Sequence, residues 1–217
     1  MQLILTNDKL YMQTFYHGTS KLFPKFDPVH ALEGDGKIKH GAGFYLTNGY
    51  RRAAHYSCKS PGSTEFYVYT VEIPDLTPDN HIEFKRPVNP SIIKRVEEKL
   101  GEPIPEKETT DGKLFRKYIA MKLAGKKSTN KLAPEDEMAA AEFLVSIGVI
   151  YNKVPFIWEK DKTKPVVHYD VIVMKPDVMH ILKIEQVNLA IDKKTKKLEL
   201  DESEGKEPTE IPLESIK

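Results

Sequence analysis

The chain has 217 residues, of which 40% are hydrophobic and 30% are charged, so it is long enough for one large domain with a substantial core. Lysine and arginine number 33 against 32 acidic residues, and the net charge of +1 provides no global field that would attract nucleic acid. Cys58 is the single cysteine, which excludes an internal disulfide, and no apolar run approaches the roughly 20 residues of a membrane span. We therefore expect a soluble cytoplasmic protein without a signal peptide.

The first third of the chain predicts strands that alternate with loops and one helix. Residues 12–17 are rich in aromatic side chains and predict a short strand, and the glycines and prolines of 21–40 predict a loop. A strand is expected from Phe44, followed by a helix that Asn48 caps. The alternating, β-branched segment 64–73 predicts the clearest strand of the chain.

The middle of the chain predicts helices, and its end predicts strands again. Helices are expected at 90–100, 111–123 and 135–147, and strands at 154–158, 166–174, 187–191 and 198–200, the last two as a hairpin. Long strands broken by a helical block predict an α+β fold of two small antiparallel sheets packed face to face. We expect one domain over 1–200 with a helical insertion at about 90–148, and a mobile acidic tail over 201–217.

Three separated segments carry the candidate chemistry. The first is Tyr16-His17-Gly18-Thr19-Ser20, the second is Gly41-Ala42-Gly43-Phe44-Tyr45-Leu46-Thr47 with the helix after it, and the third is the strand that opens with Asp170. Glycine beside histidine lets a ligand approach bare backbone, and a tyrosine can stack on a flat ring. A carboxylate within an apolar strand is costly unless it is paired or functional.

Together the three segments resemble the ADP-ribosyltransferase superfamily, in the His–Tyr–acidic class that includes poly(ADP-ribose) polymerases and diphtheria-type toxins. The likeness is greatest to small bacterial and phage domains of polyvalent proteins, and it covers roughly 12–73 and 140–184. It implies a split β-sandwich fold and NAD⁺ as co-substrate. It also implies transfer of a single ADP-ribose to a protein or nucleic-acid acceptor, in a toxin, effector or phage-conflict protein with a possible inhibitory partner and no membrane contact.

The resemblance also implies roles for individual residues. His17, Tyr45 and Asp170 would be catalytic: His17 would orient the adenosine ribose, and Asp170 would lie near the nicotinamide ribose, where a carboxylate favours positive charge at the anomeric carbon. Tyr45 would stack on one side of the nicotinamide ring. The remaining binding residues would be Gly18, Thr19, Ser20, Gly43, Tyr56 and Ser57, with Gly18 meeting the carboxamide through its backbone and Tyr56 stacking on the second side of the ring.

Asp170 departs from the glutamate that is commonest in the family, which favours single transfer over chain building and leaves inactivity open. Glu159 and Glu185 are alternative acids. NAD glycohydrolase activity, a non-catalytic pseudoenzyme that binds NAD or a partner, and an RNA 2′-phosphotransferase are the competing functions.

Each candidate residue also has an interpretation that involves no ligand. His17 can be a satisfied histidine, the Gly-x-Gly segment a plain turn, and Asp170 one half of an ion pair with Lys175, Lys183 or another cation. Lys37, Lys39 and His40 lie in the expected loop and either contact the NAD pyrophosphate or are simply solvated. Arg51 and Arg52 are expected to be surface charges. The histidines lack metal-ligand spacing, so no metal site is expected, and Cys58 is expected to be an inert thiol.

Overall fold

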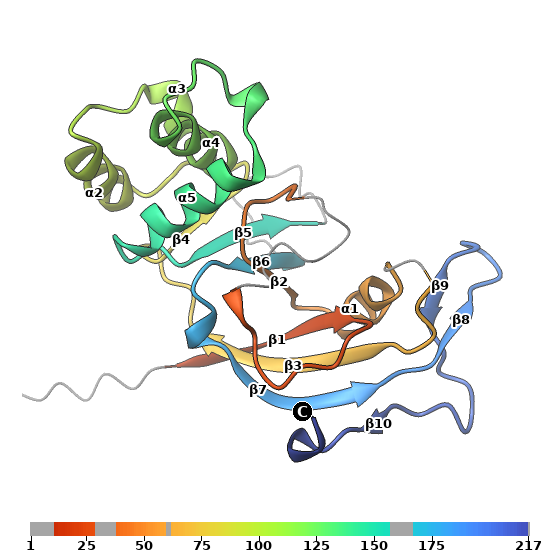
Figure 1. Ribbon diagram of the computed structural model, residues 1–217. Coiled ribbons are helices and arrows are strands. Elements are labelled where there is room, and N and C mark those ends of the chain that lie inside the picture. The colour runs from red at the N-terminus through yellow and green to blue at the C-terminus, as the bar shows by residue number, and fades with distance from the viewer. Residues whose placement is uncertain (1–10, 29–37, 60–61, 157–166, 217) are drawn as a thin grey trace, which may run out of the picture.

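The structure is a computed structural model that describes residues 11–28, 38–59, 62–156 and 167–216. Its main strands are β1 (Met12–Thr19), β2 (Phe44–Thr47), β3 (Tyr67–Pro74), β4 (His81–Glu83), β5 (Tyr151–Pro155), β6 (Tyr169–Val173), β7 (His180–Gln186) and β10 (Thr209–Glu210). In the described part these join into one eight-stranded sheet with the order β10-β7-β3-β1-β2-β6-β5-β4 (Figure 1). All neighbours are antiparallel except β4 and β5, which are parallel.

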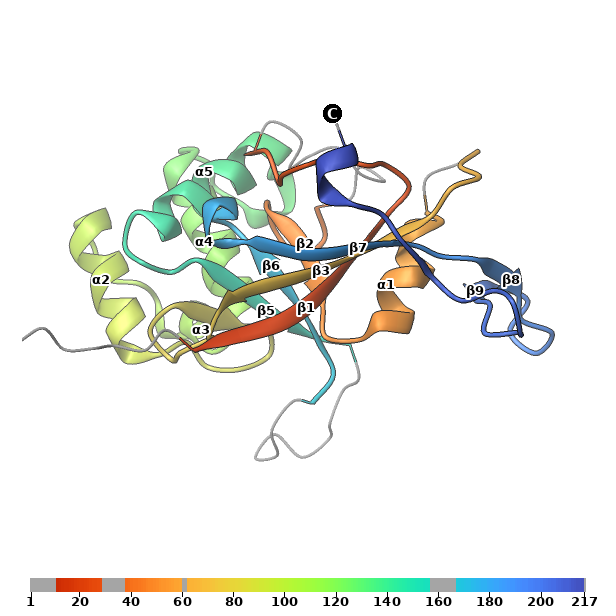
Figure 2. The ribbon, with the colours of Figure 1, turned by 90° about the horizontal axis from the view of Figure 1, so that it is seen from below.

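The sheet is weakly joined at its middle. Eight residue pairs connect β1 to β3, whereas the single pair Tyr16–Thr47 connects β1 to β2. The strands therefore form two halves that run in different directions, with β1, β3 and β7 on one side and β2, β5 and β6 on the other (Figures 1 and 2). The expectation of two separate sheets is corrected by this pair, which makes them halves of one sheet. The α+β class is confirmed.

Helix α1 (Tyr50–Ser57) covers one face of β1 and β3. Its buried Ala53 and Ala54 pack against Val68, and these small residues let the helix approach the strands closely. A Cβ atom on Gly18 would lie 1.7 Å from the Ala53 carbonyl oxygen, so only glycine permits this approach. The helix is capped by Gly49 without a side-chain hydrogen bond, which corrects the expectation that Asn48 is the cap.

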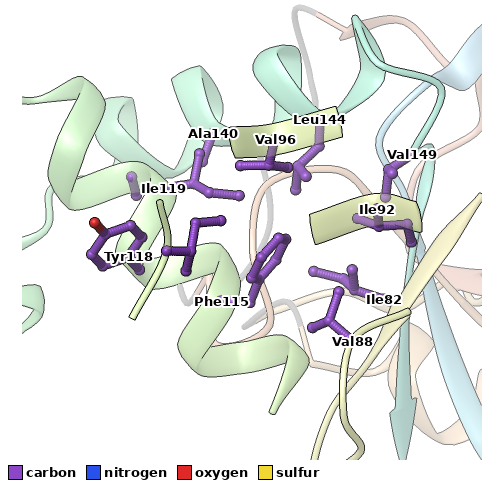
Figure 3. Packing of buried hydrophobic residues seen from close by; sticks show 12 residues of the cluster. Ile82, Val88, Ile92, Val96, Phe115, Tyr118, Ile119, Ala140, Leu144 and Val149 are labelled. Carbon is purple, nitrogen blue, oxygen red and sulfur yellow. The ribbon is translucent and has the colours of Figure 1, made fainter. Parts of the chain in front are cut away.

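Four helices come between β4 and β5 in the sequence, and they form a second hydrophobic core away from α1 (Figures 1 and 2). They are α2 (Pro90–Leu100), α3 (Glu106–Thr109), α4 (Gly112–Leu123) and α5 (Pro134–Val145). Figure 3 shows their facing apolar side chains, among them Val96 of α2, Phe115 and Ile119 of α4, and Leu144 of α5. The expected helical block is confirmed, and Asp111 caps α4 as its sequence position predicts. The cap of α2 is Asn89, which was not predicted. Both side chains accept from the backbone N–H two residues on.

The C-terminal part adds β7 and β10 to the sheet beyond β3 and forms a hairpin beside α1. A separate hairpin of β8 (Leu189–Ile191) and β9 (Leu198–Leu200) confirms the expected pairing and lies beside α1 (Figure 2). The sequence did not predict β7, in which Ile184 is the one fully buried residue. The segment 201–217, expected to be mobile, contributes β10 through pairs with Glu185 and Gln186. In the described ranges no helix has the length and apolar character to cross a bilayer.

Candidate functional site

His17 lies in β1 beside the point where the two halves of the sheet diverge. Its ring packs among aromatic rings, with centroids 5.3 Å from Phe26, 6.1 Å from Phe23 and 6.2 Å from Tyr69. Nδ1 lies 2.9 Å from the carbonyl oxygen of Tyr45; since a carbonyl only accepts, Nδ1 carries the proton and Nε2 is the acceptor. Burial lowers the pKa of His17 more than this hydrogen bond raises it, so the ring is neutral near pH 7.

The residues that follow His17 are engaged mainly in local structure. Gly18 faces α1, as described above, and not an open space. Thr19 accepts a hydrogen bond from the Lys21 N–H at 3.1 Å, which forms a turn. Ser20 is half-buried in a bend after the strand. The glycine of this motif therefore has a packing reason that is independent of any ligand.

Tyr45 closes the turn that precedes it. Its hydroxyl donates to the Gly41 carbonyl at 2.9 Å and accepts from the His40 N–H at 3.1 Å. Gly41 has a φ of +102° and Gly43 a φ of +137°, in the region that favours glycine. A Cβ on Gly43 would lie 2.6 Å from the Val173 carbonyl oxygen of β6, so both glycines are required by the turn itself.

Asp170 is a buried carboxylate, 6% exposed, that the chain's own arginine holds at both oxygens. Arg52 of α1 donates from Nε to Oδ1 at 2.9 Å and from Nη2 to Oδ2 at 2.7 Å. Burial lowers the pKa of Arg52, but the hydrogen bond and charge of Asp170 outweigh it and leave that pKa above its usual value. The expectation of an ion pair with another cation is confirmed, whereas the expected surface position of Arg52 is wrong because the carboxylate draws it inward.

Asn48 fastens the start of β6 to the start of α1. Its Nδ2 donates to the Val167 carbonyl at 2.6 Å, and its Oδ1 accepts from the Tyr169 N–H at 3.2 Å. The backbone N–H of Asn48 donates to the Tyr169 carbonyl at 3.3 Å. These bonds fix where Asp170 lies relative to α1, and they explain why Asn48 does not serve as a helix cap.

The register decides which candidate side chains share a face. Tyr16 pairs with Thr47, and Thr47 pairs with Asp170, so these three point to the same side of the sheet. Tyr45 is two residues from Thr47 and lies on that side too, about 7–8 Å from Asp170 by the spacing of diagonal neighbours. His17, one residue from Tyr16, points to the opposite side and reaches Tyr45 only through its backbone carbonyl.

Tyr56 and Ser57 differ in their availability to a ligand. Tyr56 is 40% exposed, and its ring centroid lies 4.8 Å from the Arg52 guanidinium carbon. Ser57 is 1% exposed and donates from Oγ to the Ala54 carbonyl at 2.6 Å within its own helix. The expected role of Ser57 in binding NAD is thus opposed by its burial, while Tyr56 presents a partly exposed ring beside the Arg52 guanidinium. Cys58 is a free thiol whose Sγ donates to the His55 carbonyl.

A buried polar group beneath the turn was not predicted from the sequence. Arg116 of α4, 1% exposed, pairs with Glu137 of α5, with Nε 2.8 Å from Oε2 and Nη2 donating to Oε1 at 3.2 Å. A Cβ on Gly41 would lie 2.7 Å from Arg116 Nη1, so the guanidinium lies directly against the turn. Asn152 donates from Nδ2 to the His40 carbonyl at 3.1 Å from the same side.

His40 connects this polar group to the Asp170 end of the site. Burial lowers its pKa, the charge of Asp170 raises it, and the charges of Arg116, Lys113 and Lys39 lower it further. Among the residues that the structure describes, its Nδ1 has no hydrogen-bond partner. Between these ends lies a small apolar cluster of Phe84, Val154 and Ile172 against which Tyr45 packs.

The remaining candidates lie away from these side chains or outside the described residues. Arg51 is exposed and pairs with Glu202, and Lys39 is exposed. Glu185 accepts from the Tyr50 hydroxyl at 3.1 Å and pairs with Lys183. Lys37 and Glu159 fall outside the described residues.

An open groove of about 600 Å³ lies on the His17 side of the sheet. Phe26 lines it and also contacts the His17 ring edge to face. Its other walls are formed by Pro24, Lys25, Pro28, Pro176, Asp177, Met179, His180, Ile181 and Leu213. The groove and the Asp170 carboxylate are therefore on opposite sides of the sheet, with His17 adjoining the groove.

Within the described ranges, no three histidine, cysteine or acidic side chains cluster as metal ligands would. No protein-family model matches the sequence, and the search of curated proteins gives no match.

Proposed function

We propose that the protein is an NAD⁺-dependent ADP-ribosyltransferase that attaches a single ADP-ribose to a macromolecule and releases nicotinamide. The observation that carries the proposal is the placement of Tyr45 and the buried Asp170 on one face of adjacent strands, where the sheet divides. As diagonal neighbours the two residues are close enough for one small ligand to contact both. The family resemblance of the three segments supplies the chemistry.

Several further observations support this proposal. Tyr56 offers an exposed ring beside Arg52, the partner of Asp170, on the helix that follows Tyr45. His17 lies on the other side of the sheet and supports the site only through its hydrogen bond to the Tyr45 carbonyl, which helps to hold β1 against β2. The division of the sheet between β1 and β2 is compatible with the split sandwich that the resemblance implies.

The proposed reaction depends on charge stabilisation. The bond between nicotinamide and ribose breaks through an oxocarbenium-like sugar, as in glycoside hydrolysis. Asp170 would accept a hydrogen bond from the ribose and favour the developing positive charge, while the tyrosine rings hold the leaving group. Arg52 uses one acceptor site on each carboxylate oxygen, so a ribose hydroxyl would bind at a second lone pair or in place of Arg52.

A second candidate is a pseudoenzyme that binds NAD or a partner without turnover. The observation that favours it is the same bidentate Arg52–Asp170 contact, which leaves both carboxylate oxygens bonded. The two functions differ in one measurable respect, because only the transferase releases nicotinamide.

The test is incubation of the purified protein with NAD⁺ labelled in the adenosine half, together with cell lysate. Transferase activity leaves the label on a polymer, and separate protease and nuclease digestions show whether that polymer is protein or nucleic acid. Free ADP-ribose as the sole product indicates a glycohydrolase. Unchanged NAD⁺ contradicts the proposal and favours the pseudoenzyme.

A further inference from the structure

The Arg52 guanidinium occupies a site that has three walls. Besides its two hydrogen bonds to Asp170, its central carbon lies 3.9 Å from the centroid of Phe156 and 4.8 Å from that of Tyr56. The carboxylate comes from β6, the tyrosine from α1 and the phenylalanine from the end of β5. Three separate elements thus supply the groups that hold one flat cation.

This combination suits a guanidinium better than other cations. A carboxylate presents two oxygens in a plane that matches the fork of two N–H donors, and aromatic faces attract the delocalised charge. An ammonium group can satisfy only part of this arrangement because it is compact and strongly hydrated. Asp170 is more than nine-tenths buried, so water solvates its charge only weakly when Arg52 is removed.

Arg52 is also an unusual residue for its place in the helix. It lies in the first turn of α1, where the helix dipole disfavours a positive charge, and that turn has no acidic residue. Its neighbour Arg51 points to solvent and pairs with Glu202, with side chains 73% and 53% exposed. Arg51 lies in the same turn, so what distinguishes Arg52 is its bidentate contact with the buried Asp170.

We propose that Asp170, Tyr56 and Phe156 form a guanidinium-binding pocket that Arg52 fills in the resting protein and that receives an arginine side chain of the acceptor. The acceptor part rests on the proposed function, whereas the pocket itself does not. Arg52 leaves the pocket when a competing guanidinium enters it.

In the transfer step one guanidinium nitrogen bonds to the anomeric carbon of the ribose. The bond from that carbon to nicotinamide breaks, and its electron pair stays on the nicotinamide ring nitrogen. The acceptor loses one proton, which passes to the Asp170 carboxylate and then to water. The products are neutral nicotinamide, the ADP-ribosylated guanidinium and a proton, which balance NAD⁺ and a protonated arginine.

The pocket is tested by thermal unfolding with agmatine, a free guanidinium compound, against putrescine, a diamine without one. The variant is Arg52→Ala, the matched control is Arg51→Ala, and Arg52→Gln serves if the alanine variant fails to fold. At ten times its dissociation constant, agmatine should raise the Tm of Arg52→Ala by about 3–6 °C. Putrescine should not, and adding Asp170→Asn to Arg52→Ala should abolish the shift.

Equal shifts in the Arg52 and Arg51 variants, or equal shifts with the two ligands, would overturn the pocket. The acceptor is tested in the unaltered protein with labelled NAD⁺, where agmatine should receive label at least about tenfold faster than putrescine. In the cell-lysate assay, label carried by amino-acid residues other than arginine, or by nucleic acid, refutes arginine as the acceptor. An absence of all transfer refutes the proposed function instead, and the thermal measurement still decides the pocket.

Discussion

The buried pair of Arg116 and Glu137 gives a sharp test of how the helical block supports the site. Both side chains are almost fully buried, at 1% and 8% exposed, so solvent cannot compensate for the loss of either partner. Burial already lowers the pKa of Arg116, and the charge and hydrogen bond of Glu137 act against that. Glu137→Ala leaves an unpaired buried guanidinium, which costs about 3–5 kcal/mol of unfolding free energy.

For a chain of this length that loss corresponds to a fall in Tm of about 6–20 °C. The measurement is urea and thermal unfolding followed by circular dichroism. Replacing both residues together, as Arg116→Met with Glu137→Leu, should restore most of the stability because no charge is left buried. The control is Glu98→Ala, whose partner Lys94 is 3.9 Å away on an exposed helix face and whose loss should cost less than about 0.5 kcal/mol. A Glu137→Ala variant within about 1 kcal/mol of the unaltered protein, or a double variant as unstable as the single, would refute this reasoning.

The remaining predictions concern the two strands at the division of the sheet. Gly18→Ala places a Cβ 1.7 Å from a carbonyl of α1 and should cost about 3 kcal/mol or more by urea unfolding. Gly49→Ala meets its nearest atom only at 3.6 Å and should cost no more than about 1 kcal/mol, because alanine is a poorer N-cap than glycine. Burial lowers the pKa of His17 and of His40 in the folded protein, so the unfolded chain binds more protons below about pH 6.5. The free energy of unfolding should therefore fall as the pH drops from 6.5 towards the pKa values of the folded protein, by up to about 1.4 kcal/mol per pH unit for each histidine. Replacing either histidine with glutamine should flatten that slope between pH 7.5 and 5.5, and an unchanged slope would contradict the assignment. Tyr45→Phe removes one donor and one acceptor from the turn and should lower the free energy of unfolding by about 1 kcal/mol. The rate of nicotinamide release should fall as well, because the hydroxyl no longer holds the ring in place.

Local sequence patterns predicted the elements that depend on neighbouring residues. The helix at 90–100 follows from Pro90 at its start, Gly101 at its end and apolar spacing, and the helix at 111–123 follows from the cap at Asp111 and apolar spacing. The hairpin of β8 and β9 follows from two short apolar runs around a polar turn. In contrast, β7 has one fully buried residue and many ionic ones, and it is a strand because β3 offers an edge to pair with. That information is absent from the segment itself.

The candidate site shows the same limit. Sequence reasoning identified Asp170 as a carboxylate that needs a partner, but it could not choose Arg52 because the contact joins residues 118 positions apart. A signal was available, since a cation in the first turn of a helix is electrostatically disfavoured. Glu137 offered a similar signal, as a charge in the stripe that also contains Ala140, Ala141 and Leu144.

His17 illustrates why a sequence motif does not determine the face of the sheet to which a side chain points. The sequence places His17 and Tyr45 in two motifs of one expected cleft, but the face of a strand residue depends on register. The pair Tyr16–Thr47 sends the His17 ring to the side opposite Tyr45 and Asp170, and the link between the motifs becomes a hydrogen bond to the Tyr45 carbonyl. Tyr45 and Asp170 therefore share one face of the sheet, and His17 lies on the other.

The account depends most on the carboxylate of Asp170, and its most direct test is the rate of nicotinamide release from NAD⁺ by matched variants. Asp170→Asn keeps the shape of the side chain but removes its charge, and it should slow release by about 10²–10³-fold. Glu185→Gln, an acid on β7 that is bonded to Tyr50 and Lys183, should leave the rate unchanged. Release that is equal in the Asp170→Asn variant and the unaltered protein would contradict the account.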